Sequence, residues 1–395
     1  YVINTCTVTN MSDRKSRQII NATRRDNKNA IIVVCGCFSQ NAFNSGRLDE
    51  IDADIIIGNK DKTKILDLID EFKQTKKQIR LFYDLRNVEF EDMKISHFEH
   101  KTRGFVKIQD GCNNFCSYCI IPYTRGNVRS KKKENVISEI KALVKNGYKE
   151  VVLTGIHTGH YGQDLKEYDF SDLLLELEQI DGLERIRISS IEITELTDKF
   201  MDVLKTSKKI VNHIHIPLQS GCDKILKAMN RKYDMQYFIN KINQIRSIRK
   251  DIAITSDVIV GFPGETDEDF NITKENIKKI KFTELHVFPY SKREGTPAAI
   301  MKNQIDGNIK KQRVKELIEI SEELKNEYYK KFIGKSLEVL VETYSDGYLI
   351  GHLSNYGKVK FKGDESFLHN LVMVKLNDYI NDEFMGELIK EEVQV

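Results

Sequence analysis

The sequence predicts a mixed α/β protein in three parts: an N-terminal parallel α/β sheet, a central partial (β/α)6 barrel and a small antiparallel β-barrel at the C-terminus. Short apolar runs alternate with helical segments near the N-terminus, which is typical of parallel sheets. Six more strand–helix units follow Gly104, as in a partial parallel barrel. Five short β-rich runs separated by turns close the chain. We expect the three parts at residues 1–95, 98–330 and 331–395, with a polar linker at residues 73–103.

The length of 395 residues is too great for one ordinary hydrophobic core, which supports several domains. Apolar residues make up 40% and charged residues 31%, and these values exclude collagen, coiled-coil, low-complexity and disulfide-scaffold proteins. The longest apolar run, Ile31 to Phe38, is far shorter than a membrane span, and no basic-then-apolar leader opens the chain. We therefore expect a cytoplasmic location and no membrane partner. The net charge of +3 neither favours nor excludes a polyanionic partner.

Strands of the first part are predicted at residues 1–5, 30–34 and 55–57, with a helix after the first strand whose N-cap is Ser12. Cys6 and Cys37 each fall just past the C-terminal end of a strand. Open α/β sheets bind their ligands at that edge, so we expect these two cysteines to belong to a site. Because the chain begins inside a strand and without a methionine, we also expect that an N-terminal piece precedes Tyr1.

The barrel strands are predicted at residues 105–108, 151–153, 185–189, 213–216, 254–260 and 285–288. Helical stretches between them include residues 132–145, 171–179 and 267–281, and a charged helix with an apolar stripe follows at residues 309–329. A parallel barrel places its chemistry at the C-terminal ends of its strands. Strands of the final barrel are predicted at residues 337–342, 348–353, 358–361, 370–375 and 384–389.

Three of the seven cysteines, Cys112, Cys116 and Cys119, are spaced by four and three residues. Such a loop fits a metal centre, and iron–sulfur clusters normally take four cysteine ligands. A triplet without a nearby fourth cysteine leaves one iron open to another ligand. The alternatives are a chance grouping of buried cysteines and a zinc site completed by a distant histidine. Zinc ligands usually come as two pairs, which favours the cluster.

The loop from Cys112 to Cys119 resembles the radical S-adenosylmethionine (SAM) superfamily, whose pattern is C-x3-C-x-aromatic-C; here Tyr118 supplies the aromatic residue. The similarity extends to the methylthiotransferase branch and covers nearly the whole chain. It includes an N-terminal methylthiotransferase domain and a C-terminal RNA-binding barrel of the TRAM type. Within the branch, the chain is most similar to enzymes that convert N6-threonylcarbamoyladenosine (t6A) in tRNA to its 2-methylthio form. Further segments carry the likeness, at residues 109–111, 120–126, 153–156, 189–192, 215–221, 257–266 and 285–296.

The resemblance implies a [4Fe–4S] cluster on Cys112, Cys116 and Cys119, with SAM bound to its open iron. SAM cleavage then gives a radical that abstracts hydrogen from an unactivated carbon. The residues predicted to bind this cofactor are Tyr118, Gly155, Ser190, Glu192 and Gly261. From the residues alone, Gly155 and Gly261 end apolar strands and would let backbone approach a ligand. From the residues alone, Glu192 fits a surface carboxylate in a loop better than a pocket residue, whereas the resemblance implies that it lines the pocket.

In this family three N-terminal cysteines hold an auxiliary [4Fe–4S] cluster. Cys6 and Cys37 match the second and third of them, and the first has no position in this sequence. Cys35 is the one conceivable substitute, but we interpret it as an apolar strand residue and the first ligand as lost by truncation. Cys222 fits neither set, and we expect it to be a buried free thiol.

Basic residues follow the cluster loop closely and are predicted to form a rim that contacts phosphate; a solvated helix start is the alternative. These residues are Arg125, Arg129, Lys131, Lys132 and Lys133.

Lysines of the final barrel, Lys358, Lys360 and Lys362, alternate on one strand face, where they are suited to follow an RNA backbone. Five histidines show no metal-ligand spacing among themselves, and we give them no catalytic role. They are His157, His160, His213, His215 and His286.

Together these predictions describe an enzyme that methylthiolates C2 of t6A beside the tRNA anticodon, with two [4Fe–4S] clusters and with SAM as both methyl donor and radical source. Its expected partners are tRNA, an electron donor and a sulfur source. Alternative substrates are isopentenyladenosine in tRNA and a ribosomal protein side chain. The absent first cysteine favours a different hypothesis, a non-catalytic iron–sulfur RNA-binding protein.

Overall fold

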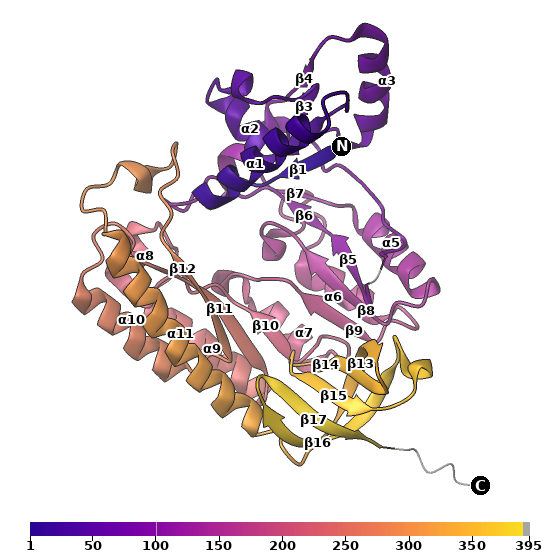
Figure 1. Cartoon of the computed structure of the whole chain (residues 1–395). Coiled ribbons are helices and arrows are strands. Elements are labelled where there is room, and N and C mark those ends of the chain that lie inside the picture. Colours follow the sequence, from indigo (N-terminus) through magenta and orange to yellow (C-terminus); the bar gives the residue numbers. More distant parts are fainter. Residues whose placement is uncertain (100, 390–395) are drawn as a thin grey trace.

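The computed structural model describes residues 1–99 and 101–389 (Figure 1). The chain folds into a small parallel α/β sheet, a central partial barrel of two parallel three-stranded sheets covered by helices, and a closed β-barrel. The predicted fold class is therefore confirmed. No helix of the described residues is both long enough and apolar enough to cross a membrane.

The N-terminal sheet is parallel and has the strand order β1-β2-β3-β4. Its strands are β1 (Val2–Thr5), β2 (Val33–Gly36), β3 (Ile55–Ile57) and β4 (Ile79–Leu81), and its helices are α1 (Asn10–Asp26), α2 (Cys37–Asn44) and α3 (Ile65–Thr75).

Two sequence predictions for this part were wrong. The helix α1 is capped by Thr9, whose Oγ1 accepts a hydrogen bond from the Ser12 amide at 3.1 Å, so Ser12 lies inside the first turn. Residues 79–81, assigned to the linker, form β4 and pair with β3. A three-residue strand among polar neighbours has too little periodicity to be detected, and pairing with β3 decides its conformation.

The central part consists of two three-stranded parallel sheets, β5-β8-β9 and β10-β11-β12, joined by a bridge between Ile186 and Ile210. Its strands are β5 (Arg103–Lys107), β8 (Glu150–Thr154), β9 (Arg185–Ile188), β10 (His213–His215), β11 (Ala253–Val260) and β12 (Glu284–Pro289). The covering helices include α5 (Lys133–Lys145), α6 (Phe170–Glu178), α7 (Asp198–Thr206), α9 (Met235–Ile248), α10 (Asp267–Ile280) and α11 (Gly307–Lys330).

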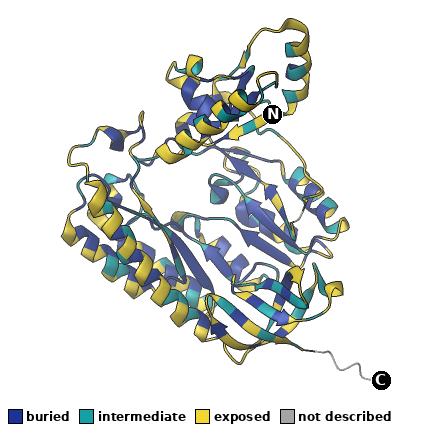
Figure 2. Cartoon of the chain, viewed as in Figure 1, coloured by how far each residue is buried: buried dark blue, intermediate teal, exposed yellow. Residues whose placement is uncertain are grey.

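One face of each barrel strand packs against these helices in the largest hydrophobic core, which contains Val106, Leu153, Ile214, Val258 and Leu285. Alternate residues of the same strands point to the opposite, inner face because side chains alternate along a strand. Figure 2 shows the buried strands at the centre and the exposed outer surfaces of the helices. The inner face is thus the surface available for chemistry.

The C-terminal barrel is closed in the order β13-β14-β15-β17-β16. Its strands are β13 (Ser336–Ser345), β14 (Tyr348–Leu353), β15 (Lys358–Lys362), β16 (Leu371–Ile380) and β17 (Glu383–Leu388). Four of the five strand pairs are antiparallel as predicted, whereas β15 and β17, which close the barrel, pair in parallel.

The C-terminal barrel packs against the central part of the chain through buried charged side chains. The guanidinium of Arg187, itself bound to Glu150 at 2.8 Å, lies 3.9 Å from the ring centroid of Tyr356. Arg185 donates to the Glu338 carbonyl at 2.9 Å. These contacts place the C-terminal barrel against the N-terminal ends of β8 and β9.

Candidate active site

The cysteine loop extends from the first barrel strand. The short strands β6 (Gln109–Asp110) and β7 (Arg129–Ser130) pair with each other, so the intervening residues form an excursion anchored at its base. Within it, the Cys119 amide donates to the Cys116 carbonyl at 2.9 Å. The Ser117 hydroxyl donates to the Ala228 carbonyl at 2.8 Å, which fixes the loop against α8 (Asp223–Ala228).

The three thiols of this loop fit an iron–sulfur cluster better than a single ion. Burial raises the pKa of Cys119 to about 12, and the nearby charges of Cys116 and Cys112 add to the rise. Three neighbouring thiolates are therefore costly without a cation, and metal coordination deprotonates a thiol outright. In the described part of the chain, the three sulfur atoms do not all lie within 4.8 Å of one another, as the ligands of a single ion would. A cluster suits wider spacing because each thiolate binds a different iron.

Arg231 and Glu192 stand beside this loop. Arg231 Nη1 lies 3.3 Å from the Cys116 sulfur, and Nη2 donates to Glu192. Tyr118 is half-buried near the same guanidinium, and desolvation of its hydroxyl raises its pKa well above the usual value. The structure thus places Glu192 beside the cysteine loop, near Tyr118 of that loop. Sequence analysis missed Arg231, because a lone arginine after a helix carries no motif.

A histidine pair also borders the loop. Nε2 of His157 lies 2.6 Å and Nε2 of His160 lies 3.0 Å from Glu195, and Nδ1 of His157 lies 3.8 Å from the Cys112 sulfur. Burial lowers the pKa of His157, but its contacts with Cys112 and Glu195 outweigh burial and raise that pKa to about 10. The sequence shows no metal-ligand spacing among the histidines themselves, and the structure adds Glu195 to His157 and His160 as the third member of a compact group. That carboxylate lies 35 residues further along the chain, outside any local spacing pattern.

The two predicted pocket glycines approach side chains of the chain itself. A Cβ on Gly261 would lie 2.3 Å from Lys310 Cγ, and one on Gly155 would lie 3.0 Å from Gln109 Oε1. Neither position has space for a side chain, and the approach of SAM to the backbone of these glycines stays a prediction. The Ser190 carbonyl accepts a hydrogen bond from the Thr158 hydroxyl.

Cys6 and Cys37 lie at one edge of the N-terminal sheet. Thr5 of β1 pairs with Gly36 of β2. Cys6 follows Thr5 and Cys37 follows Gly36, so the two cysteines leave neighbouring strands at the same level of the sheet. Cys6 is exposed, whereas Cys37 is buried and its sulfur accepts a hydrogen bond from Asn59 Nδ2 at 3.4 Å.

The remaining two cysteines, Cys35 and Cys222, are both buried in the protein, as predicted. Cys35 packs in the core with Val33, Ile55 and Ile57. Cys222 is buried, and its thiol donates to Asp269 at 3.4 Å.

The predicted basic rim is largely a buried ion-pair network, which corrects the sequence prediction. Arg125 and Arg129 each lie 3.0 Å from the Asp110 carboxylate, and Arg125 also faces the Cys37 thiol. Lys131 is 1% exposed and pairs with Glu139. A run of basic residues does not reveal such carboxylate partners, because they lie elsewhere in the sequence.

The lysines of β15 do share one face. Lys358 and Lys362 are exposed and Lys360 is half-buried, while the intervening Val359 and Phe361 are buried in the barrel. Lys360 and Lys362 lie over the ring of Tyr348, at 4.8 and 6.0 Å from its centroid. This surface combines positive charge with an aromatic ring.

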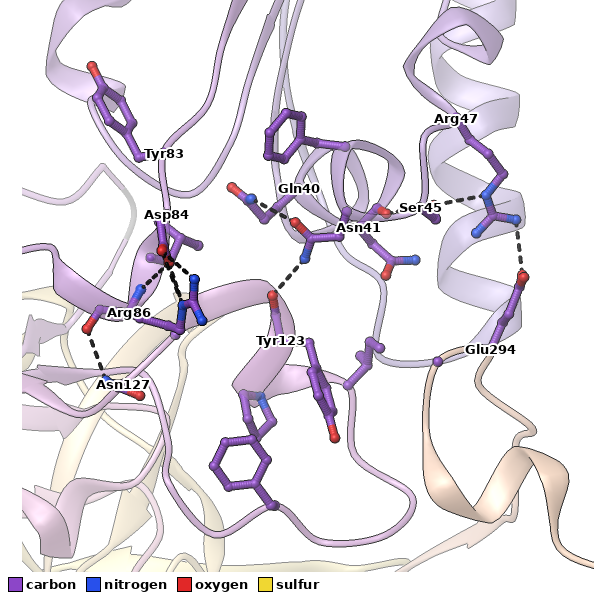
Figure 3. Close-up of a pocket in the computed structure, with 18 residues that line it drawn as sticks. Gln40, Asn41, Ser45, Arg47, Tyr83, Asp84, Arg86, Tyr123, Asn127 and Glu294 are labelled. Carbon is purple, nitrogen blue, oxygen red and sulfur yellow. Dashed lines mark hydrogen bonds and ion pairs between the residues drawn. The ribbon is translucent and has the colours of Figure 1, made fainter.

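A cavity of about 880 Å³ lies between the N-terminal sheet and the cysteine loop (Figure 3). Asn44 Nδ2 donates to the Tyr123 carbonyl at 2.7 Å, and Arg47 pairs with Glu294 at 3.1 Å. Phe115 and Tyr123 are exposed and pack edge to face with centroids 5.8 Å apart. Amides, guanidinium groups and open aromatic faces therefore line this cavity.

Comparison with known proteins defines the class. A family model described as the radical SAM superfamily matches residues 106–277, and one described as uncharacterized protein family UPF0004 matches residues 1–58. A structure of the radical SAM methyltransferase TsrM from Kitasatospora setae, with tryptophan and a SAM analog bound, superposes with a TM-score of 0.55 at 17% identity, covering 75% of this chain and 63% of that one. This likeness concerns the fold alone. The protein is a radical SAM enzyme.

Its relatives are more specific. The chain is 47% identical to threonylcarbamoyladenosine tRNA methylthiotransferase MtaB of Bacillus subtilis, over 95% of this chain and 85% of that protein. It is 40% identical to MtaB of Aquifex aeolicus, over 86% of this chain and 83% of that protein. It is 38% identical to tRNA-2-methylthio-N(6)-dimethylallyladenosine synthase of Lachnoclostridium phytofermentans, over 99% of this chain and 87% of that protein. The chain therefore belongs to the family of radical SAM tRNA methylthiotransferases.

Proposed function

We propose that this enzyme methylthiolates C2 of t6A beside the tRNA anticodon and uses SAM both as methyl donor and as radical source. The observation that carries the substrate is the identity of 47% to a threonylcarbamoyladenosine enzyme, against 38% to a dimethylallyladenosine enzyme of similar coverage. Dimethylallyladenosine, which is the same nucleoside as isopentenyladenosine, is thus the second candidate.

Cys112, Cys116 and Cys119 would hold the cluster that binds SAM, and Cys6 and Cys37 would contribute to an auxiliary [4Fe–4S] cluster. When bound, the first cluster supplies the electron that cleaves SAM. Arg231 and Glu192 form a largely buried charge pair beside Cys116, where charged groups act strongly because little water reaches them. Their role would be to orient the charged end of SAM.

Two surfaces support RNA as the substrate. The lysine face of β15 offers charge for phosphates and Tyr348 for stacking, a combination typical of single-stranded RNA binding. The cavity beside the cysteine loop offers the exposed rings of Phe115 and Tyr123. Proteins commonly recognise RNA loops by stacking splayed bases on such rings.

The proposal is tested with anaerobically reconstituted full-length protein, SAM, a reductant and a sulfide source. Parallel reactions contain tRNA with t6A, tRNA with isopentenyladenosine, or ribosomal protein. Nucleoside and peptide mass spectrometry should find the methylthio group on t6A. If the methylthio group is found on isopentenyladenosine or on the ribosomal protein while t6A is unchanged, t6A is not the substrate and the modified molecule takes its place.

A further inference from the structure

A polar group lies on the inner face of the second barrel sheet, formed by His215, Asp257 and His286. The three residues come from the adjacent parallel strands β10, β11 and β12. Asp257 and His286 are register partners, and the ligand atoms of all three side chains lie within 4.8 Å of one another. The family's cysteine loops do not include these residues, and the roles given above do not use them.

The group faces inward, away from the helices. Ile214, Val258 and Leu285 on the same strands are buried in the helix-packed core, so their strand neighbours point to the opposite face. His215 is 12% and Asp257 32% exposed at the side chain, and His286 is exposed. Solvent, and therefore a ligand, reaches all three from the inside of the barrel.

Hydrogen bonds hold the first histidine in place. The Thr255 hydroxyl lies 2.9 Å from Nδ1 of His215 and 3.0 Å from Nε2 of His213. The other nitrogen of the His215 ring, Nε2, lies 3.4 Å from Asp257, and the His286 ring lies 5.6 Å from the His215 ring. His215 is thus oriented by Thr255, and the edge of His286 stays open.

The group is also close to the candidate SAM site. The His215 carbonyl accepts a hydrogen bond from the Ile191 amide at 3.0 Å. The next residue, Glu192, is the partner of Arg231 at Cys116. A nucleoside whose reacting carbon sits at that site would extend its substituent along this inner face.

We propose that His215, Asp257 and His286 recognise the threonylcarbamoyl substituent of the target adenosine, an inference that rests on the proposed function. That substituent carries a carboxylate, a hydroxyl and urea N–H groups. The imidazole N–H groups are suited to the carboxylate, and Asp257 is suited to accept from the urea or hydroxyl. An isopentenyl group is a hydrocarbon and would leave all of these polar groups desolvated without partners, which is costly. The group thereby selects t6A over isopentenyladenosine.

The test uses reconstituted full-length protein and anticodon stem-loop RNAs that differ only at the target nucleoside, which is t6A, isopentenyladenosine or adenosine. His286→Leu should weaken binding of the t6A RNA by about tenfold, which is the effect of removing one charge-assisted hydrogen bond. Binding of the adenosine RNA should not change. His286→Gln, which keeps an N–H donor, should restore much of the preference, and Asp257→Asn should reduce it. His97→Leu, at an exposed histidine in the segment before β5, is the matched control and should behave as wild type.

Several outcomes separate the possibilities. If the wild type prefers t6A RNA and the preference survives both His286→Leu and Asp257→Asn, this inference fails while the proposed function stands. If the wild type prefers and modifies isopentenyladenosine RNA, the proposed function fails first. Metal analysis after incubation with Zn²⁺ or Mn²⁺ provides a further check. One equivalent of either ion that is absent from His286→Leu would make the group a metal site and overturn the inference.

Discussion

Arg231 donates a hydrogen bond of 3.3 Å to the sulfur of Cys116. The same guanidinium pairs with Glu192, so one side chain links the cysteine loop to the end of the third barrel strand. Arginine can serve two partners at once because its donors form a planar fork. The arrangement fixes a charged pair where SAM would bind.

Replacing Arg231 should therefore impair SAM use without removing the cluster. Arg231→Lys offers a point charge that cannot serve Glu192 and Cys116 together, and we expect SAM cleavage to fall by at least about tenfold. Iron content and the cluster absorption should stay near wild type. Arg249→Lys, at an arginine that donates to backbone carbonyls such as Leu204 O, is the control. Unchanged cleavage in Arg231→Lys would exclude the proposed role.

Cys116 should be indispensable for SAM cleavage. Each thiolate of the triplet would be a cluster ligand, so Cys116→Ala should abolish formation of 5′-deoxyadenosine. Cys222→Ala removes another buried thiol and should leave this product unchanged. Production of 5′-deoxyadenosine by Cys116→Ala at the wild-type rate would show that the cluster is held elsewhere.

Cys37 should act in sulfur transfer and not in SAM cleavage. Cys37→Ala should keep 5′-deoxyadenosine formation and lose the methylthio product, with a lower iron content. Cys35→Ala, two residues away in the core, should keep both activities and cost only a little stability. Equal damage from the two substitutions would mean that Cys35 is a ligand after all.

The lysine face of β15 should set the salt dependence of tRNA binding. Lys358→Ala, Lys360→Ala and Lys362→Ala combined should lower the slope of log affinity against log salt by up to about one unit for each phosphate that these lysines bind. The control replaces the exposed Lys278, Lys279 and Lys315 on the outer helices. Identical affinities of the β15 variant and wild type at every salt concentration would place the RNA surface elsewhere.

Asp110 should make stability depend on acid pH. Burial would raise the pKa of this carboxyl, but the charges of Lys107, Arg125 and Arg129 outweigh burial and hold the pKa below its usual range. Its stabilising effect is therefore complete above the unfolded-state pKa of about 3.9 and is lost as the pH falls through the lowered folded-state pKa.

Asp110→Asn should accordingly reduce the free energy of unfolding by about 3–5 kcal/mol at neutral pH, because it leaves buried cations unpaired. The difference from wild type should shrink as the pH falls below about 4. Urea titrations at several pH values measure both effects. Asp70→Asn breaks the exposed pair with Lys73 and should change stability little at any pH. A pH-independent difference for Asp110→Asn would contradict the ionic explanation.

The sequence contained enough local information to predict most elements and the cysteine loop. The spacing of Cys112, Cys116 and Cys119 is a short-range pattern, and strand periodicity located the six barrel strands and the closed C-terminal barrel. These features depend on neighbours in the chain, so they are visible without a structure.

Features that depend on distant partners were missed or misread. Arg231 meets Cys116 only because the loop before α9 returns to the cysteine loop. Arg129 and Lys131 looked like surface charges, because nothing local indicates that Asp110 and Glu139 pair with them. Folding brings such groups together across the sequence, and local patterns do not encode those pairings.

The proposed methylthiolation of t6A in tRNA is tested most directly by mass spectrometry of tRNA nucleosides from cells with and without the gene. We predict that 2-methylthio-t6A disappears on deletion, that t6A accumulates, and that the full-length gene restores the modified nucleoside. The Cys116→Ala gene should not restore it. A deletion strain whose 2-methylthio-t6A level equals that of the parent, or in which 2-methylthio-isopentenyladenosine is lost instead, would contradict the proposed function.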